Sequence, residues 1–74
     1  MGYPNPFVNT ISFKLTDQGR VYKLNLFNAI GEKVLEQPVT NNQTISTSHL
    51  SHGIYFYTIT NNSTEVFNGK LIKN

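Results

Sequence analysis

Residues 50–55, Leu50-Ser51-His52-Gly53-Ile54-Tyr55, lead into the strand that decides the fold. The side chains that follow fall into two alternating sets, Tyr55, Tyr57 and Ile59 on one face and Ile54 and Phe56 on the other. A period of two is typical of a β-strand, and apolar residues on both faces predict a central strand, buried on one side and partly covered on the other. Gly53 permits the turn before this strand, because glycine adopts positive φ at little cost, and it should aim Tyr55 into the core.

The segments before this strand also alternate with a period of two. Residues 10–16 form the clearest example, in which the apolar Ile11, Phe13 and Leu15 share one face. A hairpin follows, with strands over residues 22–26 and 32–37. Gly31 supplies the positive φ that the connecting turn needs. Pro38 ends the returning strand or confines it to a sheet edge, because proline has no N–H to donate.

Two further strands are expected after the hairpin. Residues 43–48 form a short one with Ile45 inward, and residues 64–73 form the last. In the last strand Phe67 and Leu71 lie on one face and Val66 and Ile72 on the other, and Gly69 is a candidate bulge. The sequence does not decide whether the face of Leu71 or that of Ile72 is buried. Six or seven short strands separated by Asn, Gly and Pro turns predict a small antiparallel β-sandwich, and a barrel of the same strand number remains an alternative.

The first residues form a stiff lead into the first strand. In Tyr3-Pro4-Asn5-Pro6-Phe7, the prolines Pro4 and Pro6 fix their own φ near about −65° and hold Tyr3 and Asn5 extended. We expect residues 3–74 to be a single domain, with residues 1–2 as an expression start.

Composition excludes several classes of function. The 74 residues include six Lys or Arg and four Asp or Glu, and the net charge of +2 is too dispersed for a nucleic-acid-binding face. The chain has no cysteine, so no disulfide or thiolate metal site is expected. No apolar run approaches the roughly 20 residues of a membrane span.

The chain also has little catalytic inventory. His49 and His52 lack a third ligand nearby, so we expect no metal site. Asp17 and Glu65 are expected to be loop or strand-edge carboxylates, and any pair of the four acids could form a glycosidase pair only in principle. No nucleophile elbow or phosphate loop occurs, and we expect neither a cofactor nor enzyme activity. The sequons that begin at Asn42, Asn61 and Asn62 are better explained as turns.

Four stretches together resemble a known family. They are Tyr3-Pro4-Asn5-Pro6-Phe7, Leu24-Asn25-Leu26-Phe27-Asn28-Ala29-Ile30-Gly31, Leu50-Ser51-His52-Gly53-Ile54-Tyr55 and Lys70-Leu71-Ile72-Lys73. Their order and spacing resemble the C-terminal sorting domain, type A, of the type IX secretion system, over residues 3–73. The resemblance implies an immunoglobulin-like sandwich at the end of a larger exported protein of a Bacteroidetes bacterium.

The resemblance also implies a mechanism. Such a domain follows a passenger that has reached the periplasm. The translocon recognises the domain at the outer membrane, and the passenger leaves for the cell surface or the medium. A sortase-like peptidase then removes the domain by a cut upstream of Tyr3, so this chain is its substrate and not a catalyst.

By the same resemblance, Lys70, Leu71, Ile72 and Lys73 match the terminal stretch that the export machinery reads. A last strand at a sheet edge offers unpaired N–H and C=O groups to a partner strand, while the two lysines discourage indiscriminate pairing. The alternative role of these lysines is only to guard the edge. The isolated domain is expected to be a monomer or a weak edge-strand dimer.

The alternative function is a small carbohydrate-binding or adhesin module. Its tyrosines and phenylalanines would then form a stacking platform. Exposure of Tyr22, Tyr57 and Phe67 separates the two functions, because a platform needs exposed rings and a core needs buried ones.

Overall fold

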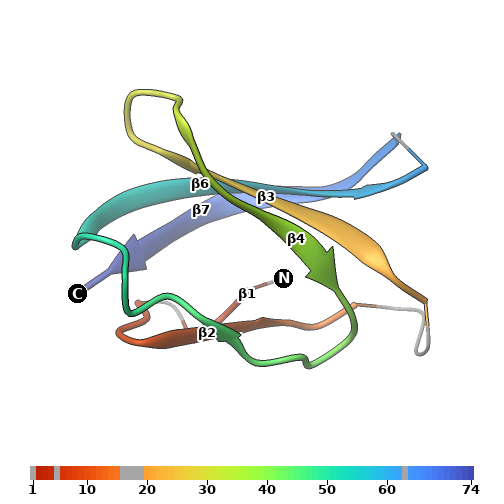
Figure 1. Ribbon diagram of the computed structural model, residues 1–74, viewed down its shortest axis with the longest axis horizontal. Helices are drawn as coiled ribbons and strands as arrows, with labels where there is room; N and C mark the ends of the chain where they lie inside the picture. The colour runs from red at the N-terminus through yellow and green to blue at the C-terminus, as the bar shows by residue number, and fades with distance from the viewer. Residues whose placement is uncertain (1, 5, 16–19, 63) are drawn as a thin grey trace.

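The computed structural model describes residues 2–4, 6–15, 20–62 and 64–74, which form two antiparallel sheets packed face to face (Figure 1). The smaller sheet has the order β1-β2-β5 and the larger sheet the order β4-β3-β6-β7. The strands are β1 (Gly2–Tyr3), β2 (Thr10–Phe13), β3 (Tyr22–Asn28), β4 (Lys33–Val39), β5 (Ile45–Ser46), β6 (Gly53–Asn61) and β7 (Thr64–Lys73). The predicted all-β sandwich is confirmed, and its two separate sheets do not form the alternative barrel.

The larger sheet contains the predicted hairpin and the predicted central strand. β6 lies between β3 and β7, which confirms the central strand, and β3 and β4 form the predicted hairpin, with Leu26 opposite Leu35. β4 is an edge strand, where Pro38 needs no N–H to donate. β7 forms the other edge.

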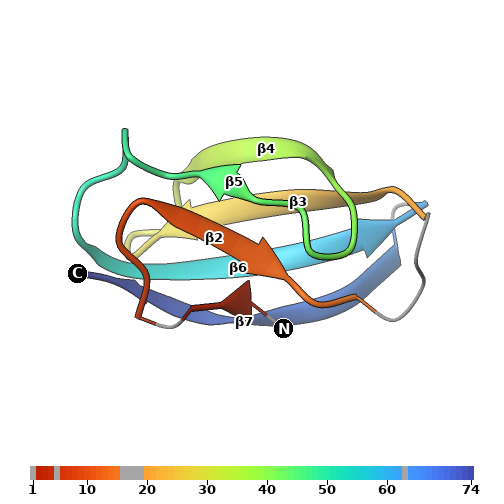
Figure 2. The same ribbon diagram turned by 90° about the horizontal axis from the view of Figure 1, so that it is seen from below.

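The smaller sheet is shorter than the sequence predicts. β2 covers only Thr10–Phe13 of the predicted residues 10–16, although Leu15 is still buried, and β5 covers only Ile45–Ser46. β1 was not expected as a strand, and it pairs Gly2 with Phe13. Seen from below in Figure 2, these short strands lie across the inner face of the larger sheet.

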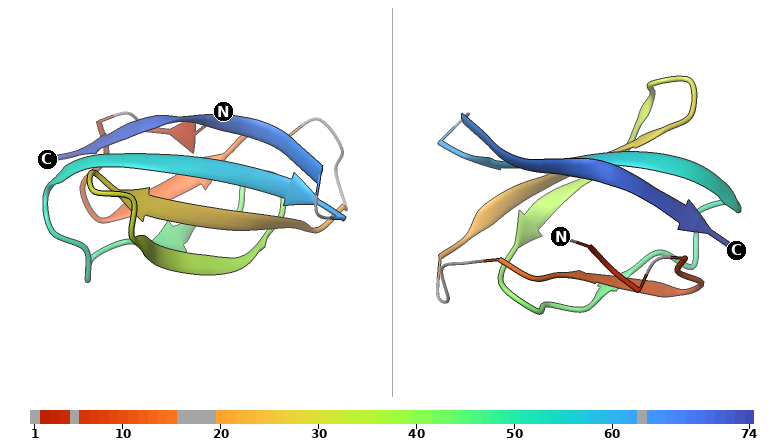
Figure 3. Two further views of the ribbon diagram at one scale, coloured as in Figure 1. Left: turned by 90° about the horizontal axis from the view of Figure 1, so that it is seen from above. Right: turned by 180° about the vertical axis from the view of Figure 1, so that it is seen from behind.

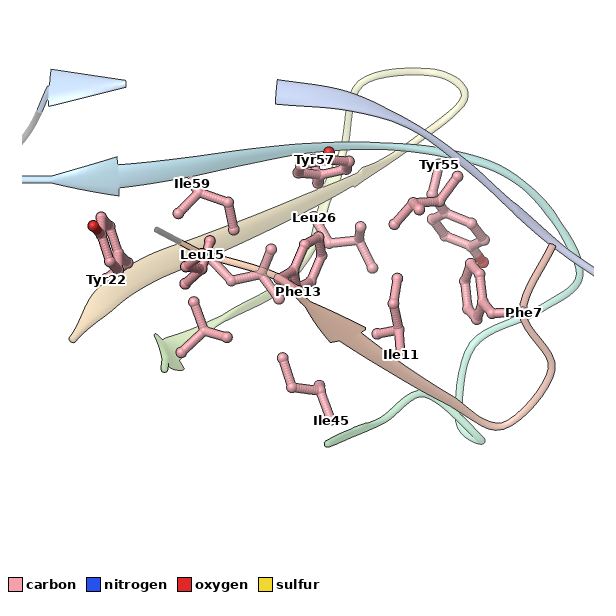
Figure 4. Packing of buried hydrophobic residues seen from close by; sticks show 13 residues of the cluster. Phe7, Ile11, Phe13, Leu15, Tyr22, Leu26, Ile45, Tyr55, Tyr57 and Ile59 are labelled. Carbon is pink, nitrogen blue, oxygen red and sulfur yellow. The ribbon is translucent and has the colours of Figure 1, made fainter. Parts of the chain in front are cut away.

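The core fills the space between the sheets (Figure 4). Its buried apolar residues are Phe7, Ile11, Phe13, Leu15, Tyr22, Leu24, Leu26, Val39, Ile45, Tyr55, Tyr57, Ile59 and Leu71. The rings of Phe13 and Tyr57 meet at a tilt, with centroids 4.9 Å apart. Alternation along each strand therefore predicted the inward faces of β2, β3 and β6 correctly.

Gly69 is not the bulge that the sequence suggested. It pairs in register with Tyr57, and the irregularity lies between Ile59 and Thr60 of β6, opposite Val66. A Cβ atom at Gly69 would lie 2.8 Å from the Tyr57 ring. The missing side chain therefore makes room for a buried ring and does not bend the strand.

Backbone conformation explains several turns. Gly31 and Gly53 have φ of 88° and 145°, and Asn42 and Asn62 have φ of 63° and 53°. Asparagine tolerates this left-handed region better than other residues with a side chain, so the turn role of these asparagines is confirmed.

Candidate recognition surface

The alternation of β7 separates its last four residues into two pairs. Leu71 is 1% exposed and Lys73 is 7% exposed, so both face the core. Lys70 and Ile72 point to the opposite side, where Ile72 is 40% exposed. The question that the sequence left open is thereby answered: Leu71 is the buried residue of the adjacent pair.

Lys73 is buried because its ammonium group has partners. Its Nζ donates to the carbonyl oxygens of Thr47 and Leu50, each at 2.6 Å. These carbonyls belong to a turn that the Leu50 N–H closes by donating to Thr47 O at 3.0 Å. A charged donor to two carbonyls offsets the cost of burying the amine, so Lys73 fastens the 47–50 turn to the end of β7.

The edge of β7 that faces away from β6 is paired at its end, although the sequence suggested that its backbone groups were unpaired. The Phe7 N–H donates to Ile72 O, and the Asn74 N–H donates to Phe7 O, both at 2.9 Å. Phe7 and Lys73 form an isolated parallel bridge, and the Phe7 ring is fully buried beside Tyr55. The expectation that this end of the strand offers unpaired backbone groups is therefore wrong, because the chain pairs it with its own first residues.

The opposite face of the larger sheet carries an apolar cluster that the sequence analysis did not identify as a surface. Direct cross-strand pairing places Lys33, Phe27, Phe56 and Lys70 in one row across four strands. Beside this row, Ile54 lies directly opposite Ile72. We call Phe27, Ile54, Phe56 and Ile72 the outer patch. Ile54 and Phe56 were expected to be partly covered, but they are 45% and 46% exposed.

An ion cluster lies next to this patch on β3 and β4. Glu36 accepts from Lys23 at 2.5 Å and from Lys33 at 2.8 Å. The hydrogen bond from Lys23, followed by the one from Lys33, lowers the pKa of Glu36 to about 2. The charge of Glu36 is therefore balanced locally.

The remaining residues singled out by the sequence lie elsewhere. Pro4 and Pro6 are exposed and come shortly before Phe7, which pairs with the edge of β7. Asn5 lies outside the described residues. Tyr55 is buried, and its hydroxyl donates to Ser51 O at 2.5 Å, which ties the turn at Gly53 to the core.

The described residues do not bring the candidate metal ligands together. His49 and His52 are exposed, and no three His, Asp or Glu side chains of the described segments are grouped to hold a metal ion. Asp17, one of the four acids, lies outside the described residues. No helix in the described parts of the chain is long and apolar enough to cross a membrane.

The three aromatic rings whose exposure a sugar-binding platform would require are not exposed. Tyr22 and Tyr57 are 5% and 6% exposed, and Phe67 is half-buried against the core. The carbohydrate-binding alternative is therefore not supported.

Comparison with known proteins agrees with the motifs at both ends of the chain. The family model described as "Secretion system C-terminal sorting domain" matches residues 2–74. A comparison with curated proteins finds no match. Because the match covers nearly the whole chain, the chain belongs to the family of C-terminal sorting domains that act as signals for type IX secretion.

Proposed function

We propose that the export machinery reads the outward half of the terminal motif, Lys70 and Ile72, while the inward half, Leu71 and Lys73, maintains the fold. The alternation of β7 is the observation that supports this division of roles. The backbone edge beside Ile72 is already paired with Phe7, so a partner reaches these residues through their side chains and not by adding a strand.

Membership of the family supports the rest of the proposed export route. A passenger precedes this domain, crosses the periplasm and is delivered by the domain to the outer-membrane translocon. A sortase-like peptidase then cuts upstream of Tyr3 and attaches the passenger to an anionic lipopolysaccharide or releases it. The chain is the substrate in this scheme and supplies no catalytic group.

The test is export of a fluorescent reporter that carries an N-terminal periplasmic signal and this chain at its C-terminus, in a bacterium that has a type IX system. We expect the intact fusion to reach the surface or the medium. The variant Lys70→Ala with Ile72→Thr should stay in the periplasm with an unchanged unfolding midpoint. Normal export of this folded variant would overturn the proposed role of the outward pair.

A further inference from the structure

The outer patch is a group of apolar side chains on the outer face of the larger sheet, with members from β3, β6 and β7. The smaller sheet packs against the inner face of β4-β3-β6-β7 only (Figure 1). The left panel of Figure 3 looks down on the opposite face, where the four strands lie nearest to the viewer. Ile54, Phe56 and Ile72 are each at least 40% exposed there. Clustered apolar side chains on such a face are typical of an interaction surface.

The patch is continuous with the proposed recognition residues. Ile72 lies directly opposite Ile54, and Lys70 lies directly opposite Phe56. Side chains directly opposite each other in an antiparallel pair have Cβ atoms about 5 Å apart. A partner that contacts Ile72 and Lys70 from this side therefore also covers Ile54 and Phe56.

The charges around the patch indicate the chemistry of the partner. The row through Phe27 and Phe56 ends in a lysine on both sides, Lys33 and Lys70. Glu36, which pairs with Lys33, also pairs with Lys23, so this group of three side chains keeps a net positive charge. An apolar centre flanked by lysines is complementary to an apolar surface that carries carboxylates. A second copy of this chain would instead place lysines against lysines.

We propose that the outer patch is the docking surface for a protein of the export machinery whose matching surface is apolar and bears carboxylates. This proposal rests on the proposed reading of Lys70 and Ile72, and it extends the read surface to β3 and β6. The partner then recognises a folded, three-stranded surface and not the terminal residues alone.

The first arm of the test uses the reporter fusion with Ile54→Thr and Phe56→Thr. Threonine is polar but keeps a high β-propensity, so the fold should be retained, and the urea midpoint checks this. The control is Val8→Thr, which changes a valine that is 54% exposed outside the larger sheet. We expect export of the patch variant to fall about tenfold or more, as for loss of central contact residues, while the control is exported normally.

The outcomes separate the two proposals. Normal export of the folded patch variant, with the Lys70→Ala and Ile72→Thr variant retained, overturns the docking surface and leaves the proposed function standing. Normal export of both variants overturns both. Should the double patch variant lower the midpoint, Ile54→Thr alone gives the same decision, because Ile54 lies outside the β3–β6 pairing.

The second arm tests the charge of the partner. Lys33→Glu and Lys23→Glu form a matched pair of variants, because each substitution removes one ion pair with Glu36. Only Lys33 lies in the row with Phe27. We expect a larger loss of export from Lys33→Glu. An equal loss would overturn the carboxylate-bearing partner.

The third arm is sedimentation of the intact fusion, which we expect to be a monomer. A dimer that Ile54→Thr and Phe56→Thr convert to monomers would make the patch a contact between copies of this chain, and it would overturn the proposal.

Discussion

At the scale of single residues, the terminal motif combines two chemistries in four positions. Lys70 and Lys73 are the same amino acid, but one is exposed and the other donates to two carbonyls inside the sandwich. The three-residue spacing places them on opposite faces of a strand. A substitution at each position therefore tests a different property, surface recognition or stability.

Lys73→Met keeps the apolar stem and removes the charged donor. We expect the free energy of unfolding to fall by about 2 kcal/mol, because two buried carbonyls lose their charged partner. Urea unfolding measures this change. The control Lys23→Met removes an exposed ion pair with Glu36 and should change the free energy of unfolding much less, because solvent screens exposed pairs. Equal losses in the two variants would contradict the structural role of Lys73.

Glu36 should titrate well below an ordinary glutamate. We expect its side-chain carboxyl to titrate at a pH of about 2 in NMR spectra, because Lys23 and Lys33 stabilise the charged form. Because the folded pKa lies below the usual 4.5, the stabilisation is present above pH 4.5 and is lost as the pH falls toward about 2. Lys23→Met should raise the pKa of Glu36, and Lys14→Met should leave it unchanged. A pKa near 4.5 in the unchanged chain would refute the ion cluster.

Sequence patterns predicted some of these residues and missed others for physical reasons. Tyr55, Tyr57 and Ile59 alternate with less buried neighbours, so their inward direction was predictable. Leu71 and Ile72 are adjacent and both apolar, so periodicity could not decide between them. The burial of Lys73 depends on carbonyls more than 20 residues away in the chain, and no local pattern reports such a contact.

At the scale of elements, β7 has partners on both of its edges. β6 pairs along its whole length, and Phe7 pairs with its last residues on the other side. Strand positions were predictable from alternation, but the β1 strand has only two residues and shows no period. The pairing of Phe7 joins segments at opposite ends of the sequence, which is why the edge was wrongly expected to be open.

Gly69→Ala tests why a glycine lies in β7. We expect it to lower the free energy of unfolding by about 1–3 kcal/mol, because the new Cβ would overlap the Tyr57 ring, which is packed against Phe13 and cannot move freely. Denaturant unfolding measures the effect. In a Tyr57→Leu background the added cost of Gly69→Ala should shrink. An undiminished cost there would show that backbone conformation, and not the ring, requires glycine.

At the scale of the whole molecule, the two faces of the larger sheet differ in what covers them. The inner face forms the core with β1, β2 and β5, and the outer face presents the outer patch and Lys70. The family was predictable from motifs at both ends of the chain. The outer patch was not, because its members come from β3, β6 and β7 and become neighbours only through strand register.

The most direct test of the central claim compares export with stability for four single variants of β7. Lys70→Ala and Ile72→Thr change the outward pair, and Leu71→Ala and Lys73→Met change the inward pair. Each variant is measured twice, by export of the reporter fusion and by its urea midpoint. We expect the outward variants to lose export at an unchanged midpoint and the inward variants to lower the midpoint. Normal export of both outward variants, with their fold intact, would contradict the central claim.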